Sequence, residues 1–206
     1  MAYTAEKALG LIESAHQKGR LAHAFLITGE AGSGKAALAA RIIQLVNPPA
    51  GAGGGENLFG EVEKPPEKSR DELGGEFVRM VRPSGKSRQI PVDDVRDMEK
   101  SFHIAAPPGK WKVGVILHAD RMNPSSENAF LKTLEEPPPE CLLILISDAP
   151  ELLLPTVLSR CVRLPLMATS GQRIVSEAGR ELLTALASLA RQGIGNISAA
   201  LTLRAS

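Results

Sequence analysis

The stretch HAFLITGEAGSGKAALAARIIQLV, residues 23–46, decides the fold. Residues 23–29 are a short apolar run ending in glycine, which is typical of a buried strand that enters a turn. Residues 36–46 are rich in Ala, Leu and Ile and predict a helix, which Pro48 and Pro49 end. A glycine-rich loop between a buried strand and a helix predicts the phosphate-binding P-loop of an α/β protein.

The loop itself carries the residues that a P-loop needs. Its glycines let backbone N–H groups turn toward phosphate oxygens, the helix N-terminus adds partial positive charge, and Lys35 can reach the outer phosphates. The alternative is an ordinary glycine-rich turn, and the spacing of Lys35 after the strand favours the phosphate site. The candidate phosphate-binding residues are Gly29, Glu30, Ala31, Gly32, Ser33, Gly34 and Lys35.

Two parts of a nucleotide-hydrolysing site are missing from the sequence. A hydrolytic P-loop follows its lysine with a Ser or Thr that binds Mg²⁺, and this chain has Ala36 there. A second buried strand should end in acidic residues, and Leu117 and His118 stand at that place. We therefore expect no metal site and no required cofactor. The sequence leaves open whether the loop is empty, holds a nucleotide weakly or binds an anion.

Strands alternate with helices over the first four fifths of the chain. Further strands are predicted at 77–81, 112–117, 141–147 and 162–166, and further helices at 5–18, 93–103 and 124–134, with a short helix leading to Ser159. This alternation predicts an α/β fold, with a five-stranded parallel sheet covered by helices on both faces.

The pattern changes at two places along the chain. Residues 47–76 are rich in Gly, Pro and charge and predict a long excursion from the fold. After residue 167 the sequence reads as purely helical, at 171–192 and 195–206. We therefore expect a P-loop domain at 1–167 and a second, incomplete helical domain at 168–206.

Composition excludes several classes of protein. The net charge of +1 provides no overall field that would attract nucleic acid or an anionic membrane. The sequence contains no apolar run of about 18 residues, so no membrane span is expected, and no signal-peptide pattern is present. Cys141 and Cys161 are too few for a four-thiolate zinc site and are expected to be buried thiols of a cytoplasmic protein.

Two later segments resemble a known family. Residues 128–138 read NAFLKTLEEPP, and residues 159–161 read Ser-Arg-Cys. Together they resemble the clamp-loader branch of the AAA+ proteins, and within it the delta-prime subunits of bacterial DNA polymerase III. The resemblance implies an AAA+ P-loop domain and a helical lid domain, with the family's C-terminal collar domain absent from this chain. It also implies Arg160 as an arginine finger that acts in the ATP site of a neighbouring subunit.

Other family features are missing or leave alternatives open. Ser198 stands where hydrolysing subunits carry a nucleotide-contacting lid arginine, and residues 47–76 lack the zinc-binding cysteines of some relatives. Arg160 could instead be a surface or salt-bridged arginine. The resemblance places Arg96 on a helix that faces DNA in clamp loaders, but the surrounding acidic residues leave an intrahelical ion pair as the alternative.

The resemblance implies a non-hydrolysing delta-prime-type subunit in a hetero-pentamer with gamma/tau and delta subunits. It would reach the sliding clamp and primed DNA through that complex, in the cytoplasm, with no ATPase activity of its own. One alternative is an ATP-hydrolysing gamma/tau-type motor subunit. Another is an unrelated P-loop kinase or transferase, which would need an acidic metal ligand at a strand end.

Overall fold

The computed structural model describes residues 2–48, 77–85, 87–104 and 106–168. The predicted excursion after residue 48, the predicted helices at 171–192 and 195–206, and Ser198 lie outside the described residues. By internal contacts the chain divides into two units, 1–170 and 171–206, and the description below concerns the first. Within this described part, no helix has the length and apolar character needed to cross a bilayer.

Strands and helices alternate along the chain, as the sequence predicts. The elements are α1 (Ala5–Gln17), β1 (Ala24–Thr28), α2 (Lys35–Val46), β2 (Val78–Val81), α3 (Val92–Phe102), β3 (Lys112–Leu117), η2 (Ala119–Arg121), α4 (Pro124–Glu135), β4 (Cys141–Ser147), η3 (Pro150–Leu152), α5 (Pro155–Leu158) and β5 (Val162–Pro165). Among the described residues, the 3₁₀ helices η2 and η3 are additions that the sequence did not predict.

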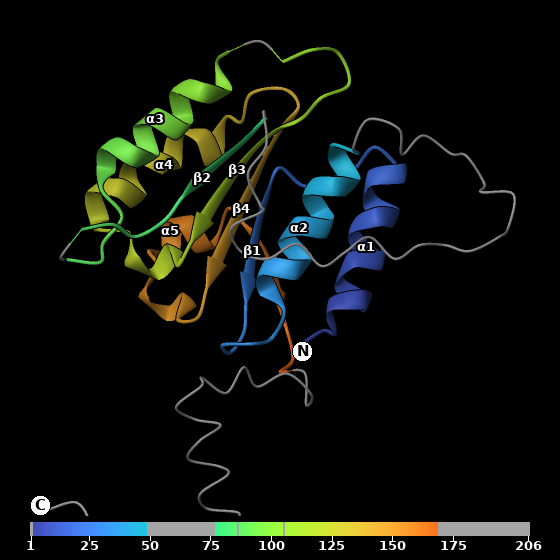
Figure 1. Ribbon diagram of the computed structural model, residues 1–206, viewed down its shortest axis with the longest axis horizontal. Helices are drawn as coiled ribbons and strands as arrows, with labels where there is room; N and C mark the ends of the chain where they lie inside the picture. Colours follow the sequence, from blue (N-terminus) through green and yellow to red (C-terminus); the bar gives the residue numbers. More distant parts are fainter. Residues whose placement is uncertain (1, 49–76, 86, 105, 169–206) are drawn as a thin grey trace, which may run out of the picture. The chain divides into compact units, whose positions relative to one another are not determined.

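The five strands form one parallel sheet in the order β2-β3-β4-β1-β5. Helices α1 and α2 cover one face, while α3 and α4 lie over the other (Figure 1). The predicted α/β class and the five-stranded parallel sheet are therefore confirmed. The order also places β1 between β4 and β5, so that the P-loop leaves the sheet beside the end of β4.

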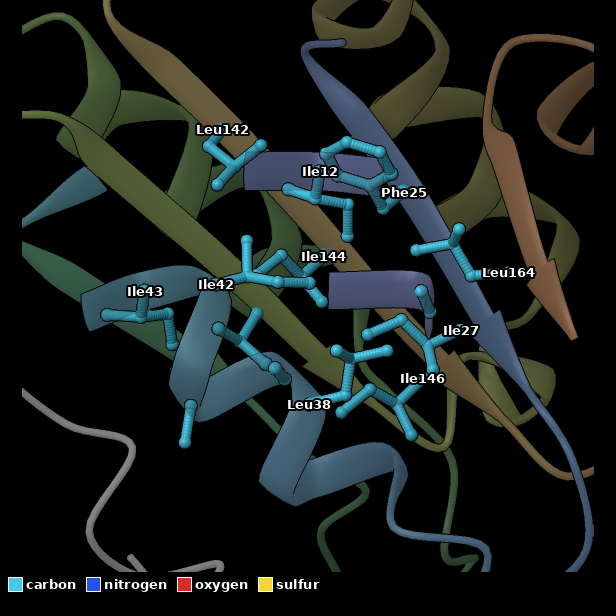
Figure 2. Close-up of a cluster of buried hydrophobic side chains, with 14 of the residues drawn as sticks. Ile12, Phe25, Ile27, Leu38, Ile42, Ile43, Leu142, Ile144, Ile146 and Leu164 are labelled. Carbon is cyan, nitrogen blue, oxygen red and sulfur yellow. The ribbon is translucent and has the colours of Figure 1, made fainter. Parts of the chain in front are cut away.

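Successive residues of a strand belong to two separate hydrophobic cores, because side chains alternate between the two faces of a sheet. In β4, Leu142, Ile144 and Ile146 point to the α1–α2 side, where they pack with residues of those helices (Figure 2). The intervening Leu143 and Leu145 belong to the core under α3 and α4. A strand that is buried on both faces needs a continuous apolar run, which explains the sequence of β4.

Close packing under α3 depends on a glycine in β3. A Cβ atom built on Gly114 would lie 2.6 Å from Phe102 Cζ and 2.9 Å from Met98 Sδ. Both side chains come from α3 and are fully buried. Gly114 therefore lets α3 approach the sheet, and α3 carries Arg96 on its outer side.

Candidate functional site: two cations at opposite edges of the sheet

The P-loop lies at the edge of the sheet where the parallel strands end. Thr28 of β1 is paired in register with Ser147 of β4, so Gly29 and Asp148 leave the sheet side by side. Leu117, the last residue of β3, is paired with Ile146 on the other side of β4. In open parallel sheets, ligands bind at this carboxyl edge.

The loop backbone uses conformations that favour glycine. Gly32 and Gly34 have φ values of +86° and +82°, in the left-handed region. A Cβ atom on Gly29 would lie 2.8 Å from the carbonyl oxygen of Leu166 and 2.7 Å from Ser33 Oγ. Gly29 is therefore required for the close approach of the loop to Leu166, which follows β5, and Gly34 directly precedes α2.

Lys35 turns its ammonium group back into the loop. Its side chain is 4% exposed, and Nζ donates hydrogen bonds to the carbonyl oxygens of Gly29 and Glu30, each at 2.6 Å. Ser33 Oγ lies 3.4 Å away. The charged partner is Asp148, whose Oδ1 lies 2.8 Å from Nζ. The lysine thus sits where the P-loop pattern predicts, but its charge is paired within the chain.

Asp148 is held by residues that follow β3. Asp120 Oδ1 accepts hydrogen bonds from Ser147 Oγ at 2.7 Å and from the Asp148 backbone N–H at 3.4 Å. The Asp120 side chain is only 7% exposed, and its Oδ2 lies 3.5 Å from Arg121 Nε. His118 Nδ1 lies 3.6 Å from Asp148 Oδ2. Asp120 therefore fixes the turn, and the Asp148 carboxylate bridges Lys35 and His118.

The positions that would bind Mg²⁺ in a hydrolytic site supply no carboxylate. Leu117 ends β3 as an apolar residue. His118 directly precedes η2 with a φ of +52°, and its carbonyl oxygen accepts a backbone hydrogen bond from Arg121. Ala36 follows Lys35 in the first turn of α2. Among the described residues, no group of three or more His, Cys, Asp or Glu side chains could hold a metal ion.

Arg160 lies between α5 and β5 and is positioned differently from Lys35. Its side chain is 34% exposed, and Nη2 forms an ion pair with Oε1 of Glu135, the last residue of α4, at 2.6 Å. Nη1 donates to the Thr156 carbonyl oxygen at 2.9 Å and to Ser159 Oγ at 3.3 Å. These three contacts use three of the five guanidinium N–H donors. Two donors therefore remain, within the described part of the chain, for an outside acceptor.

A second contact from α4 fixes the segment that leads to Arg160. Glu127 Oε2 accepts a hydrogen bond from the Leu154 backbone N–H at 2.7 Å, just before α5. The glutamate is 3% exposed, and this burial raises the pKa of its carboxyl group, while the hydrogen bond from Leu154 opposes the rise. Helix α4 therefore anchors the α5 segment at both ends, through Glu127 and Glu135.

The remaining sequence-based candidates lie elsewhere. Arg96 is exposed on α3, and its Nη1 lies 3.5 Å from Asp93 Oδ1 within the same helix, so the ion-pair alternative is present in the structure. A DNA contact by Arg96 remains a prediction. Cys141 and Cys161 are both free and buried, and burial raises the pKa of each thiol to about 12. Both are therefore inert as thiolates at neutral pH.

Sequence reasoning missed Asp148 and Glu127. Asp148 follows a buried strand directly, and such a polar residue is a recognisable signal, but its contact with Lys35 depends on β4 lying beside β1. Glu127 lies among the apolar positions of α4, three residues before buried Phe130. That spacing was the available sign that Glu127 faces inward.

The sequence is similar to a known protein family and to several of its members. Residues 4–170 match the family model described as "DNA polymerase III, delta subunit". The delta-prime subunit of Pseudomonas aeruginosa is 39% identical over 144 residues, which cover 69% of this chain and 42% of that protein. The tau subunit of Escherichia coli is 32% identical over 161 residues, covering 76% of this chain and 23% of its own length. The chain thus spans less than half the length of these relatives.

A solved structure supports the fold. A DNA polymerase III gamma-subunit-related protein from Thermotoga maritima superimposes with a TM-score of 0.57 at 21% identity, over 88% of this chain and 53% of the other. This likeness concerns the fold alone, and the AAA+ fold expected from the sequence is confirmed. Because the family model covers most of the chain, the protein belongs to the DNA polymerase III delta-subunit family, and its resemblance to the clamp-loader proteins is confirmed.

Proposed function

We propose that this chain is a non-hydrolysing, delta-prime-type subunit of the replicative sliding-clamp loader, which supplies Arg160 to the ATP site of a neighbouring subunit. Its partners would be gamma/tau-type and delta-type subunits, and it would act on the sliding clamp and primed DNA through that complex. The observation that carries the proposal is the state of the two cations. Lys35 is buried and paired within the chain, whereas Arg160 is partly exposed with donors to spare.

The geometry around Arg160 suits a contact with phosphate. A guanidinium group is planar, permanently charged and able to form two parallel hydrogen bonds to phosphate oxygens. The bonds to Thr156 and Glu135 hold the group in place, so less side-chain entropy would be lost on binding.

The alternative of an ATP-hydrolysing gamma/tau-type subunit has comparable sequence identities in its favour. The residues of the P-loop site speak against it. Ala36 has no hydroxyl group for Mg²⁺, and neither Leu117 nor His118 provides a carboxylate. The same deficiency weighs against a P-loop kinase or transferase. We propose that the loop has no required cofactor and that the chain has no ATPase activity of its own.

The test is Arg160→Ala in the full-length protein, assembled with its neighbouring subunits. Removal of an arginine that acts across an interface should lower ATP hydrolysis at the one facing site by about 10³-fold, the lower part of the range for such arginines. Loading of the clamp onto primed DNA should slow with it. Arg160→Lys should restore little, because an ammonium group lacks the planar fork.

Two controls make this experiment decisive. Size-exclusion chromatography should show equal assembly of the wild-type and variant complexes, and the isolated chain should hydrolyse no ATP with Mg²⁺. Equal hydrolysis and loading rates for wild type and Arg160→Ala at matched assembly would refute the role of Arg160. Turnover by the isolated chain would instead support the gamma/tau-type alternative.

A further inference from the structure

The buried ammonium group of Lys35 needs a negative charge beside it. A cation with a side-chain exposure of 4% is stable in a protein only when it is paired and hydrogen-bonded. In a P-loop that binds nucleotide, the phosphates supply that charge. Here the Asp148 carboxylate does so, with its Oδ1 2.8 Å from Nζ. The two carbonyl oxygens of Gly29 and Glu30 complete the set of strong acceptors.

Asp148 is placed for this contact by the sheet and by a second aspartate. The pairing of Thr28 with Ser147 brings the ends of β1 and β4 together. Asp120, itself nearly buried, accepts hydrogen bonds from Ser147 Oγ and from the Asp148 N–H. The turn is therefore fixed, and the Asp148 carboxylate is directed at the loop without any strained conformation of its own, since its φ is not among the positive values.

We infer that Asp148 is the specificity-determining residue of this loop, because its carboxylate serves as the counter-ion that a phosphate group would otherwise provide. A nucleoside polyphosphate must displace this carboxylate from Lys35 and then remain close to a like charge. Both effects weaken binding, whereas the glycine conformations and Lys35 keep the loop in a phosphate-binding shape. The inference deepens the proposed function, on which it rests, by naming the residue that closes the loop.

Replacement of Asp148 by an uncharged residue should therefore allow the loop to bind a nucleotide more tightly. Asp148→Asn keeps the size of the side chain and an oxygen that can accept from Lys35, but it removes the negative charge. We expect the variant to bind ATP, in the absence of Mg²⁺, at least tenfold more tightly than the wild-type chain. Isothermal titration calorimetry on the 206-residue chain measures this, with inorganic tripolyphosphate as a second probe that lacks the base.

Two matched variants distinguish a specific effect of Asp148 on Lys35 from the effect of removing any one negative charge. Glu151→Gln removes one negative charge from an exposed position three residues away and should change the affinity by less than twofold. Lys35→Ala combined with Asp148→Asn should abolish the gain, since the gain requires the freed ammonium group. Asp148→Ser serves as a second opening variant should the asparagine variant fail to fold, and thermal unfolding checks each protein.

Equal affinities of wild type and both opening variants would overturn the inference, whether all bind or none does. A gain of the same size in Glu151→Gln would also overturn it, because the effect would then be one of overall charge. These results are independent of the Arg160 experiment, which uses the assembled complex. A failed Arg160 experiment would refute the proposed function without changing the measured affinities of the Asp148 variants. Equal affinities of those variants would refute the role of Asp148 without changing the result for Arg160.

Discussion

Lys35 and Arg160 are two cations in one domain with opposite surroundings. The ammonium group of Lys35 is enclosed by backbone carbonyl groups and paired with Asp148. The guanidinium group of Arg160 contacts Glu135 and Thr156 and is only partly buried. The difference teaches that possession of a P-loop says little about nucleotide chemistry until the counter-ion of its lysine is known. Of these two cations, Arg160 is the one that is more accessible to another molecule.

The largest effect on stability should follow from breaking the inner pair. Asp148→Ala leaves the buried ammonium group of Lys35 with neutral acceptors only, and it should lower the free energy of unfolding by about 2–3 kcal/mol. This is below the range for a fully buried pair, because the Asp148 side chain is 40% exposed. Urea unfolding of Asp148→Ala, Lys35→Ala and the double variant gives the coupling between the two residues.

The outer pair provides the control for that experiment. Glu135→Ala should cost at most about 0.5 kcal/mol, since both Glu135 and Arg160 are accessible to water, which weakens their attraction. Equal losses of stability for Asp148→Ala and Glu135→Ala would show that the two cations do not differ as their surroundings indicate.

The next effect concerns function rather than stability. In the assembled complex, Glu135→Ala should lower kcat for ATP hydrolysis at the site facing Arg160 by about tenfold, with KM little changed, because the arginine remains but is no longer oriented. Glu135→Gln should retain part of the rate through its amide oxygen. Glu136→Ala is the matched control, since Glu136 is the exposed neighbour and forms no ion pair among the contacts of the described residues.

A rise in the rate for Glu135→Ala would reverse the interpretation. Glu135 would then compete with phosphate for Arg160 and restrain it. No change at all would mean that the bonds to Thr156 and Ser159 orient the guanidinium group without help from α4.

The sequence predicted the elements better than the contacts between them. Continuous apolar runs identified the buried strands β3 and β4 at their observed bounds, because burial on both faces leaves a strong signal. The placement of the glycine-rich loop between β1 and α2 was also predictable. The Lys35–Asp148 pair was not, because it joins residues 113 positions apart through a strand order that no local pattern encodes.

The burial of two acidic side chains, those of Asp120 and Glu127, was also not predicted from the sequence. Asp120 lies in the η2 turn, yet its side chain is nearly buried and organises the end of β4. Glu127 lies in the first turn of α4, and its side chain is also buried. In both cases the carboxylate accepts a hydrogen bond from a backbone N–H group of another segment. Sequence spacing does not show which distant N–H group will lie beside a given carboxylate.

The smallest expected effect tests how α4 supports the Arg160 side of the comparison. Burial raises the folded-state pKa of Glu127 above its ordinary value of 4.5. Between these two values the folded chain holds more protons than the unfolded chain, so stability falls as the pH rises through this window and stays reduced above it. Glu127→Gln keeps an oxygen for the Leu154 N–H but carries no charge. It should therefore raise the free energy of unfolding at pH 7 by up to about 1 kcal/mol.

The pH dependence distinguishes this cause from a simple change in packing. The gain of Glu127→Gln over wild type should shrink as the pH is lowered from 7 toward 4.5, where the wild-type carboxyl group becomes protonated and loses the cost of a buried charge. Urea unfolding at several pH values measures the difference, with Glu136→Gln, an exposed glutamate just after the other end of α4, as the control. A gain that is constant across the range would assign it to packing. A loss of stability at pH 7 would mean that the ionised carboxylate holds Leu154, and with it the Arg160 segment, more strongly than its burial opposes.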